Sequence, residues 1–353
     1  MTTLTSRQRA ILEAFDAARE AQPRLPAISI AERLSISEGE LQAARLGRDV
    51  WSLPLTPRDL ASRMHKLGRV KALTRSRLAV LEQEGVYPRL GGGGPHMGLM
   101  LAPGGLDLRL LFSQWHWTCL IRDVLPVGKG DATVRWSLQV FNRHGRALHK
   151  CFALDEEPTP AWQALAKAGN VVPPAFTQSM PREERPLPQV PELAAEWAAM
   201  SDVHQFFGLL RRHGLERREA NELMEGHFTR SLPPRAAEDV LWRAAEQRLP
   251  MMLFVASPGC VQIRTGQLVM PERRGDWLNL FGHRFTLHLD VMAITHVWRV
   301  FKPNRDGGVT SLEAFDAEGE LVLQLYAERQ EGRPERPTWR RLLEGCQTQE
   351  AVA

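Results

Sequence analysis

The two halves of this chain carry related sequences in the same order. Residues 137–145 (SLQVFNRHG) resemble residues 311–319 (SLEAFDAEG), and farther upstream residues 36–53 resemble residues 215–232. The first pair of segments is offset by 174 residues and the second by 179, a difference that fits a change of loop length within a duplicated domain. Two copies are too few for a solenoid, so the pattern predicts tandem domains.

The length of 353 residues suits two domains of ordinary size, each able to bury a core. Each copy continues to a tryptophan, Trp162 in the first and Trp339 in the second. After Trp162 follow Pro173, Pro174, Pro181, Pro186, Pro188 and Pro191. Because prolines stiffen a linker, we expect the halves to be held in a defined relation that permits a shared site. The predicted parts are an N-terminal repeat, a linker and a C-terminal repeat, at residues 1–168, 169–192 and 193–353.

The hydrophobic pattern of each half predicts helices followed by strands. In the first half, helices are predicted at residues 7–20 and 28–47. In the second half, a helical stripe consists of Val203, Phe206, Phe207 and Leu210, and a further helix is predicted at 216–224. Strands are predicted at residues 251–255, 261–264, 285–289, 293–300 and 321–326. The fold class is therefore α+β, with a helical segment and a large antiparallel β-sheet in each half.

Composition and motifs exclude several classes of protein. Lys+Arg 45 against Asp+Glu 41 is close to balance, and the four cysteines form no CxxC pair. We expect reduced, buried thiols and a cytoplasmic protein, since no signal sequence or membrane span is visible. HExxH, GxSxG and GxGxxG motifs are absent, which disfavours hydrolases and dehydrogenases. The glycine run at residues 91–94 lacks the Lys-Ser/Thr of a phosphate loop and predicts only a turn.

One histidine and several cations stand beside apolar segments. His204 lies at the edge of a helical apolar stripe, Arg217 borders the next helix's buried face, and Arg109 alternates with leucines in a strand. Gln324 and Tyr326 share one face of another strand. A haem site can be built from an imidazole nitrogen as axial ligand, apolar walls and cations for the propionates, so this set is compatible with haem.

Ordinary structural roles remain open for the same residues. A histidine beside an apolar stripe is more often a hydrogen-bonded structural residue than a ligand. The cations Arg217, Lys302 and Arg329 could be solvated charges, Gln324 and Tyr326 plain sheet residues, and Phe254 a core residue. His288 alternates with apolar neighbours and is an alternative ligand, although a place in the core or on a sheet face suits it better.

Six segments together resemble one protein family. They are residues 202–210 (DVHQFFGLL), 258–263 (PGCVQI), 302–307 (KPNRDG), 310–313 (TSLE), 71–75 (KALTR) and 107–110 (DLRL). They are similar to the bacterial cytoplasmic haemin-degrading and haem-trafficking proteins, the HemS/HmuS/ChuS/PhuS group. The resemblance covers nearly the whole chain and implies a tandem-duplicated α+β fold with haem held between its halves.

The resemblance also implies roles for individual residues. His204 would be the proximal iron ligand, and Arg109 would reach in on the distal side, as a catalytic residue if the protein is an enzyme. Leu111 stands in the haem-contacting set where an aromatic residue often follows that arginine. The ring wall and the propionate rim would be formed by Phe254, Arg217, Lys302, Gln324, Tyr326 and Arg329. One non-covalent haem b per chain is expected.

The implied function is haem handling in iron acquisition. The protein would accept haem from an inner-membrane ABC transporter and either degrade it oxidatively or deliver it to a haem oxygenase. Degradation would need an external electron donor, because no flavin or nicotinamide motif is present. A DNA-binding regulator is the alternative, since residues 30–41 (IAERLSISEGEL) have the rhythm of a helix-turn-helix. A related helix pair recurs near residues 209–223, which favours a scaffold role.

The duplication predicts a single haem site. Offsets of 179 and 174 align His204 with Leu25, Phe254 with Arg75, Gln324 with Lys150 and Tyr326 with Phe152. Because none of these residue types is kept, the first copy is expected to lack an equivalent site of its own.

Overall fold

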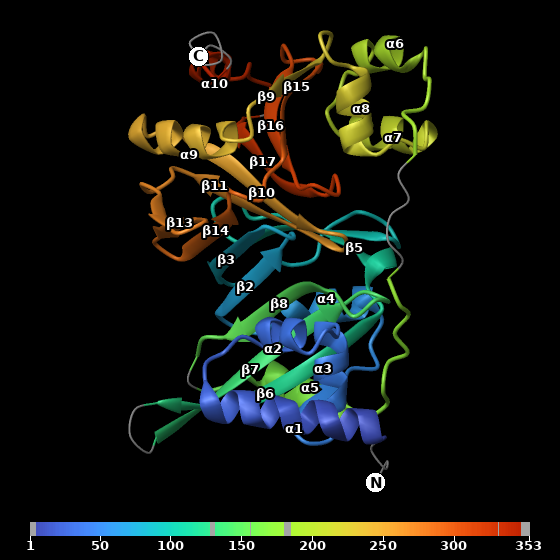
Figure 1. Cartoon of the computed structure of the whole chain (residues 1–353), viewed down its shortest axis with the longest axis vertical. Coiled ribbons are helices and arrows are strands. Elements are labelled where there is room, and N and C mark those ends of the chain that lie inside the picture. The colour runs from blue at the N-terminus through green and yellow to red at the C-terminus, as the bar shows by residue number, and fades with distance from the viewer. Residues whose placement is uncertain (1–4, 128–130, 156, 180–184, 331, 347–353) are drawn as a thin grey trace. The chain divides into compact units, whose positions relative to one another are not determined.

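The chain folds into two compact units (Figure 1). Unit 1 consists of Met1–Thr74, Gln83–Met180 and Ser257–Val261, and unit 2 of Arg75–Glu82, Pro181–Ala256 and Gln262–Ala353. The computed structural model describes residues 5–127, 131–155, 157–179, 185–330 and 332–346. Each unit combines helices with antiparallel sheet, so the predicted α+β class is confirmed.

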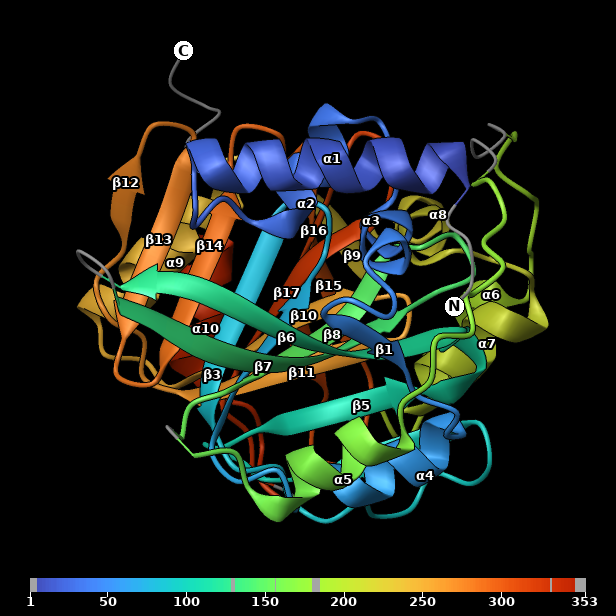
Figure 2. The ribbon, with the colours of Figure 1, turned by 90° about the horizontal axis from the view of Figure 1, so that it is seen from below.

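In unit 1 the helices surround strands that follow one another as β1-β6-β7-β8-β2, which are part of a nine-stranded sheet. Its helices are α1 (Ser6–Ala21), α2 (Ala27–Arg33), α3 (Glu38–Ala44), α4 (Pro57–Met64) and α5 (Pro160–Ala168). Its strands are β1 (Val50–Ser52), β2 (Val70–Arg75), β4 (Met97–Met100), β5 (Asp107–Leu111), β6 (Trp117–Val127), β7 (Asp131–Phe141) and β8 (Ala147–Ala153). The strand β3 (Ala79–Gly85) begins in unit 2 and ends in unit 1. Figure 2 shows the long β6–β7 hairpin beside β8.

The predicted single helix over residues 28–47 is wrong, because a turn divides it into α2 and α3. Ser35 has a φ of 54°, a left-handed conformation that ends the first helix. Ser37 then caps α3 through a reciprocal pair of bonds with Glu40. The glycine run forms the predicted loop between β3 and β4, with positive φ at Gly93 and Gly94.

Unit 2 repeats this design around strands that follow one another as β10-β17-β16-β15-β9, which are part of an eight-stranded sheet. Its helices are α6 (Leu193–Ala198), α7 (Gln205–Arg212), α8 (Arg217–Leu223), α9 (Ala236–Glu246) and α10 (Pro337–Glu344). Its sheet strands are β9 (Thr229–Leu232), β10 (Met251–Ser257), β15 (His296–Lys302), β16 (Val309–Phe315) and β17 (Leu321–Ala327). A second group comprises β12 (Glu272–Arg274), β13 (Trp277–Gly282) and β14 (Phe285–Asp290), and β11 (Cys260–Gly266) follows β10.

The two faces of this sheet in unit 2 are covered by different helices (Figure 1). The helices α9 and α10 pack on one face against Val297, Leu312 and Ala314. The helices α6, α7 and α8 pack on the other against Trp298 and Val300. Successive residues of β15 therefore point into two separate cores, as the two-residue period of a strand requires.

The registers of the two sheets locate the length changes of the duplication. Val300 pairs with Ser311 in unit 2, and Ile121 pairs with Ser137 in unit 1, so the hairpin is five residues longer in the first copy. The predicted loop-sized change lies in this hairpin. Trp162 and Trp339, the tryptophans to which the two repeats lead, are both buried in the cores of their units.

The predicted equivalence of Phe254 with Arg75 is wrong. Phe254 pairs with Gln324, and Leu73 pairs with Lys150, the counterpart of Gln324. Leu73 is therefore the equivalent of Phe254, at an offset of 181. The offset changes here because the connection from β9 to β10 in the second copy is two residues longer than that from β1 to β2.

Each unit takes one short segment from the other half of the chain. Ala79 and Leu81 are fully buried in the core of unit 2, where the carbonyl of Leu78 accepts a hydrogen bond from the Asp290 amide at 2.8 Å. Cys260 is fully buried in the core of unit 1. The exchange is reciprocal, since β2–β3 and β10–β11 are equivalent hairpins of the two repeats.

This exchange predicts a long-range effect on stability. We expect Leu81→Ala to lower the free energy of unfolding by about 2–5 kcal/mol through the cavity it leaves. Hydrogen exchange should show the loss in unit 2, at β13 and β14, although the substitution lies in the first half of the sequence. Val80→Ala, on the half-buried face of the same strand, is the matched control. Loss of protection confined to unit 1 would contradict the assignment.

Candidate functional site

His204 is placed at the start of α7, where it is the N-terminal capping residue. Its side chain is 85% exposed, and its Nδ1 lies 2.7 Å from Oδ1 of Asp202. A carboxylate at Nδ1 favours the tautomer in which that nitrogen carries the proton, which leaves the Nε2 lone pair facing solvent. The local turn therefore presents an imidazole in the form that binds a metal.

Asp202 is held ionised by its surroundings. The pKa of its carboxyl lies below the usual range because the His204 backbone N–H donates to it, and the imidazole and the charge of Arg329 add to this effect. The predicted rim residue Arg329 thus acts electrostatically on the partner of His204. This acidic partner was not identified from the sequence.

The residues beside His204 give it an apolar edge. The predicted stripe is partly wrong, since Phe206, Leu209 and Leu210 are buried whereas Phe207 is 65% exposed. Phe206 fits edge-on against Trp197 at 4.6 Å between ring centroids. Phe207 stands three residues after His204 on the same helix, so its exposed ring is available to an apolar ligand next to the imidazole.

A buried carboxylate, Glu313, gathers the predicted propionate residues of unit 2. Its Oε1 accepts bonds from Arg217 at 2.9 Å, from Lys302 at 2.7 Å and from Gln324 at 2.9 Å. Asn221 donates to its Oε2 at 3.2 Å. The structure therefore brings three of the predicted residues to one point, around an acid that was not predicted as a site residue.

The charges in this cluster are strongly coupled. Burial by itself would raise the pKa of Glu313, but Arg217 and Lys302 and the donated hydrogen bonds outweigh it, so its pKa lies well below the usual range. Lys302 is 3% exposed, whereas the Arg217 side chain is 24% exposed. Arg217 is thus the cation of this cluster that is open to a second anion, while Lys302 stays committed to Glu313.

Aromatic rings connect this cluster to both sides. The Lys302 ammonium lies 4.8 Å from the Phe206 ring centroid and 5.9 Å from that of Tyr326. Tyr326 in turn packs against Phe254 at 5.0 Å between ring centroids. These contacts form one continuous set in unit 2, from the helix of His204 to the two half-buried rings on β10 and β17.

Arg109 and Leu111 lie on β5 of unit 1, on the half-buried face of the strand. The predicted alternation is confirmed, since Leu108 and Leu110 face the core. The Arg109 guanidinium forms an ion pair with buried Asp107, and its side chain keeps 29% exposure. Asp107 thereby fixes the direction of an arginine that remains open to solvent.

His288 has a role of its own on β14. Its Nδ1 lies 2.6 Å from the Asn279 amide oxygen, and its ring packs edge-on against Phe281. It belongs to the β12–β13–β14 group rather than to the sheet of Phe254 and Tyr326. This geometry favours a histidine on a sheet face.

The family follows from comparison with known proteins. A family model described as "Haemin-degrading HemS.ChuX domain" matches residues 35–168 and again residues 214–346. The chain belongs to the HemS family. The double match also confirms the tandem duplication.

Relatives and solved structures of the HemS family match over nearly their whole length. The chain is 37% identical over 336 residues to the hemin transport protein HemS of Yersinia enterocolitica, covering 94% of this chain and 96% of that protein. Its fold matches the heme degrading enzyme ChuS of Escherichia coli O157:H7 with a TM-score of 0.87 and 33% identity, over 96% of this chain and 99% of that one. It matches holo-PhuS, a heme-binding protein from Pseudomonas aeruginosa, with a TM-score of 0.84 and 34% identity, over the same shares.

In this member of the HemS family, unit 1 has differently charged residues at the positions equivalent to Lys302, Gln324 and Arg217. The registers align Lys302 with Asp123, and Gln324 with Lys150. Lys150 pairs with buried Glu38, at the helix position equivalent to Arg217. The first repeat therefore has no counterpart of the Glu313 cluster among these aligned residues.

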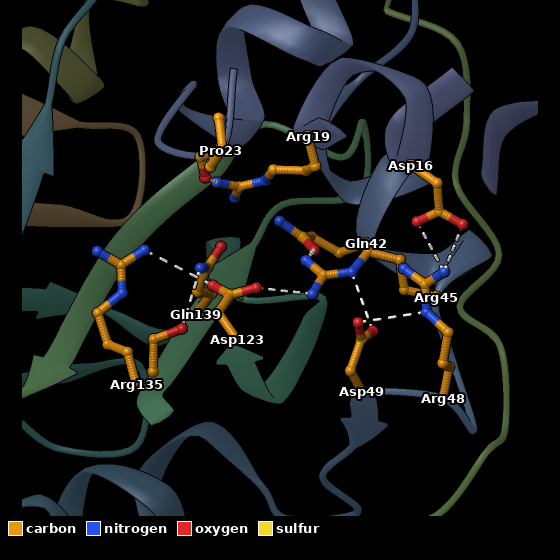
Figure 3. A network of polar contacts seen from close by, with 11 residues as sticks. Asp16, Arg19, Pro23, Gln42, Arg45, Arg48, Asp49, Asp123, Arg135 and Gln139 are labelled. Carbon is orange, nitrogen blue, oxygen red and sulfur yellow. Dashed lines mark hydrogen bonds and ion pairs between the residues drawn. The ribbon is translucent and has the colours of Figure 1, made fainter. Parts of the chain in front are cut away.

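Figure 3 shows a network of polar contacts in unit 1. Arg45 lies between the Asp123 carboxylate at 2.7 Å and the Asp49 carboxylate at 3.0 Å. Burial opposes its charge, but the two carboxylates outweigh this and raise the pKa of Arg45. Gln42 accepts a bond from the same guanidinium at 2.7 Å. These groups bond to one another, which makes them structural.

Glu313 and Asn221 are the main site residues that sequence reasoning missed. Glu313 stands in a strand whose seven residues are all buried, between Leu312 and Ala314. A lone charged residue in a strand that is otherwise uncharged and flanked here by Leu312 and Ala314 indicates a buried charge with partners, and this signal was available. Its partners Arg217 and Asn221 lie 96 and 92 residues away, and no local pattern identifies them.

Proposed function

We propose that this HemS-family protein binds haem in bacterial haem uptake and iron acquisition, with His204 as the axial ligand of the iron. The observation that carries the proposal is the exposed imidazole whose Nδ1 is held by Asp202, because the second nitrogen is then free to coordinate. The names of the relatives, a hemin transport protein and heme-binding or heme-degrading proteins, point to the same ligand.

The donor set of unit 2 fits haem better than a bare metal ion. Among the residues that the structure describes, no three His, Cys, Asp or Glu side chains gather to hold an ion. Haem iron already has four porphyrin nitrogens, so a single imidazole suffices. Phe207 offers an apolar surface beside His204, and Phe254 and Tyr326 offer a ring wall.

In this proposal each polar residue has a defined task toward haem. Asp202 keeps the His204 imidazole in its ligating tautomer and orientation. Arg217, partly exposed, pairs with a propionate, while Glu313 holds Lys302 and Gln324 in place behind it. Arg329 adds positive charge at the rim.

We further propose that Arg109 of unit 1, positioned by Asp107, acts on the distal side of the same haem beside Leu111. The support is the resemblance of its strand to the family and its fixed, partly exposed guanidinium. The charged residues at the equivalent positions of unit 1 form ion pairs within that unit. We therefore propose one non-covalent haem b per chain.

Bound haem supplies the redox chemistry of its iron, and two fates of the ligand remain compatible with this site. The protein acts in the cytoplasm on haem received from an inner-membrane ABC transporter. It then either degrades haem with electrons from an external donor or passes it to a haem oxygenase. No helix in the described part of the chain is long and apolar enough to cross a membrane.

The comparisons give the DNA-binding alternative no support, and the second helix of the suspected motif argues against it. Glu38 and Gln42 of α3 are buried, bonded to Lys150 and Arg45. A recognition helix needs such polar side chains in contact with bases. These two face the interior of unit 1.

The experiment that tests the function is a haemin titration of the full chain followed by reduction under air. We expect saturation at one haem per chain with a histidine-type Soret spectrum. An electron donor with catalase present should then give a bilin-type product and released iron if haem is degraded. Intact haem that transfers to an added haem oxygenase would establish the carrier role. Catalase is needed because free peroxide bleaches haem without an enzyme, and absence of saturable haemin binding would overturn the proposal.

Arg109 can be tested separately from binding. We expect Arg109→Leu to keep the Soret spectrum of the ferric complex and to lower the rate of haem degradation or transfer by about tenfold or more. Arg122→Leu, at an exposed position of unit 1, is the matched control and should match the wild type. Equal rates for both variants would remove Arg109 from the site.

A further inference from the structure

Unit 2 contains a cavity of about 270 Å³ that the proposed haem site does not use. It lies between the loop into β9, the strands β9, β15 and β16, and α10. Its lining residues are Gly226, His227, Phe228, Thr229, Arg230, Arg299, Phe301, Thr310, Arg340 and Glu344. Three arginines and one glutamate give this lining an excess of positive charge.

The cavity and the Glu313 cluster lie on opposite faces of the same strands. Arg299 and Phe301 line the cavity, whereas Lys302, the next residue of β15, points to Glu313. Thr310 of β16 likewise lines the cavity, and Ser311 bonds to Lys302 on the other face. The cavity is therefore separate from the haem-binding set proposed above.

Two of the arginines are directly opposite one another in the sheet. Arg230 on β9 and Arg299 on β15 are paired residues of an antiparallel ladder, so their side chains leave the same face. Like charges in this arrangement destabilise a sheet. Arg230 reaches the Glu225 carboxylate only at 3.6 Å. Within the described residues, half-buried Arg299 has no hydrogen bond or ion pair, so its charge is uncompensated.

The third arginine and the aromatic residues give the cavity fixed walls. Arg340 is anchored by Glu335 at 3.0 Å and by the Gly307 carbonyl at 2.8 Å. Its guanidinium lies 5.7 Å from the Phe301 ring centroid. Phe228 is stacked on Trp197 with an interplanar angle of 7°. Phe301 is therefore the half-buried ring on the cavity side of the sheet, because the Phe228 ring packs toward α6.

We propose that this cavity binds a small molecule that carries a phosphate or carboxylate group on a planar ring. The oxyanion bridges the guanidinium groups of Arg230 and Arg299, whose planar forks match two oxygens of such a group, and relieves their repulsion. The ring lies against Phe301. The volume lies just below the roughly 300–1,000 Å³ typical of ligand pockets, which restricts the ligand to a compact one.

The test is calorimetric titration of the full chain with three probes at constant ionic strength. Adenosine monophosphate represents a ring with a phosphate, phthalate represents a ring with carboxylates, and adenosine is the neutral comparison. We expect saturable binding of one or both anions and none of adenosine. Preference between the two anions identifies the oxyanion that the cavity takes.

Variants connect the binding to the cavity. Arg299→Gln should weaken the preferred anion about tenfold or more through loss of a charged partner. Arg235→Gln, at an exposed position outside the cavity, is the matched control and should leave the affinity unchanged. Haemin titration of Arg299→Gln should match the wild type, which separates this site from the haem site. The proposal would be overturned if neither anion showed saturable binding. It would also be overturned if the Arg299 and Arg235 variants bound the anion with equal affinity.

Discussion

Replacing His204 by alanine is expected to weaken haemin binding by at least about 10–100-fold, the loss that follows even from removing a partner of a metal ligand. The imidazole is the axial donor of the proposed site, and neither neighbour in the set, Phe207 or Asp202, offers a nitrogen. The Soret band of any haem still bound should shift, because another ligand or water would then coordinate the iron. Absorption titration of the ferric complex measures both changes.

Two further variants distinguish ligation from a general loss of structure. His283→Ala removes an exposed histidine of the same unit and should leave the spectrum unchanged. Asp202→Asn keeps the shape of the turn but removes the negative charge beside Nδ1, so the haemin affinity of this variant should fall between those of the wild type and His204→Ala. If His204→Ala kept the wild-type spectrum and affinity, iron ligation by His204 would be refuted.

The parts of the fold that were predicted correctly depend on local pattern. Alternation in residues 321–326 and 251–255 identified β17 and β10, because a half-buried strand repeats every two residues. The duplication identified the tandem architecture. The break at Ser35 was missed where residues 28–47 were predicted as one helix, although the helix-turn-helix rhythm of residues 30–41 contained it; the capping pair Ser37 and Glu40 marks the start of α3. The burial of Ala79 and Leu81 in the core of unit 2 also could not be predicted from local pattern, because these residues alternate as in any strand.

The sequence predicted which residues belong to the candidate site better than it predicted how those residues are arranged. Arg217, Lys302 and Gln324 are brought together, but around Glu313, which turns Lys302 and Gln324 inward. Ion pairs between distant segments decide which cation stays exposed to a ligand. The periodicity of a sequence does not reveal such pairs. The exposure of Phe207 was not predicted either, because which side of α7 is buried depends on its packing against Trp197 and the sheet.

Glu313→Gln is expected to lower the free energy of unfolding at pH 7 by about 3–5 kcal/mol, the usual cost of breaking a buried ion pair. The substitution keeps the shape of the side chain but leaves the Lys302 ammonium, which is 3% exposed, without its carboxylate. Urea unfolding followed by tryptophan fluorescence measures the change. Glu318→Gln, at an exposed ion pair with Arg77, is the matched control and should cost no more than about 1 kcal/mol.

The pH dependence of this difference provides an independent check. Because the folded-state pKa of Glu313 lies below that of the unfolded chain, its contribution is fully present above the unfolded value of about 4.3 and is lost as pH falls toward the folded value. The gap between wild type and Glu313→Gln should therefore be constant from pH 7 to about 5 and narrow below about 4. A gap that widened on acidification would contradict an ionised Glu313. Replacing the pair together, as Glu313→Leu with Lys302→Met, should recover part of the loss, because no buried charge is then left unpaired and Arg217 can turn to solvent.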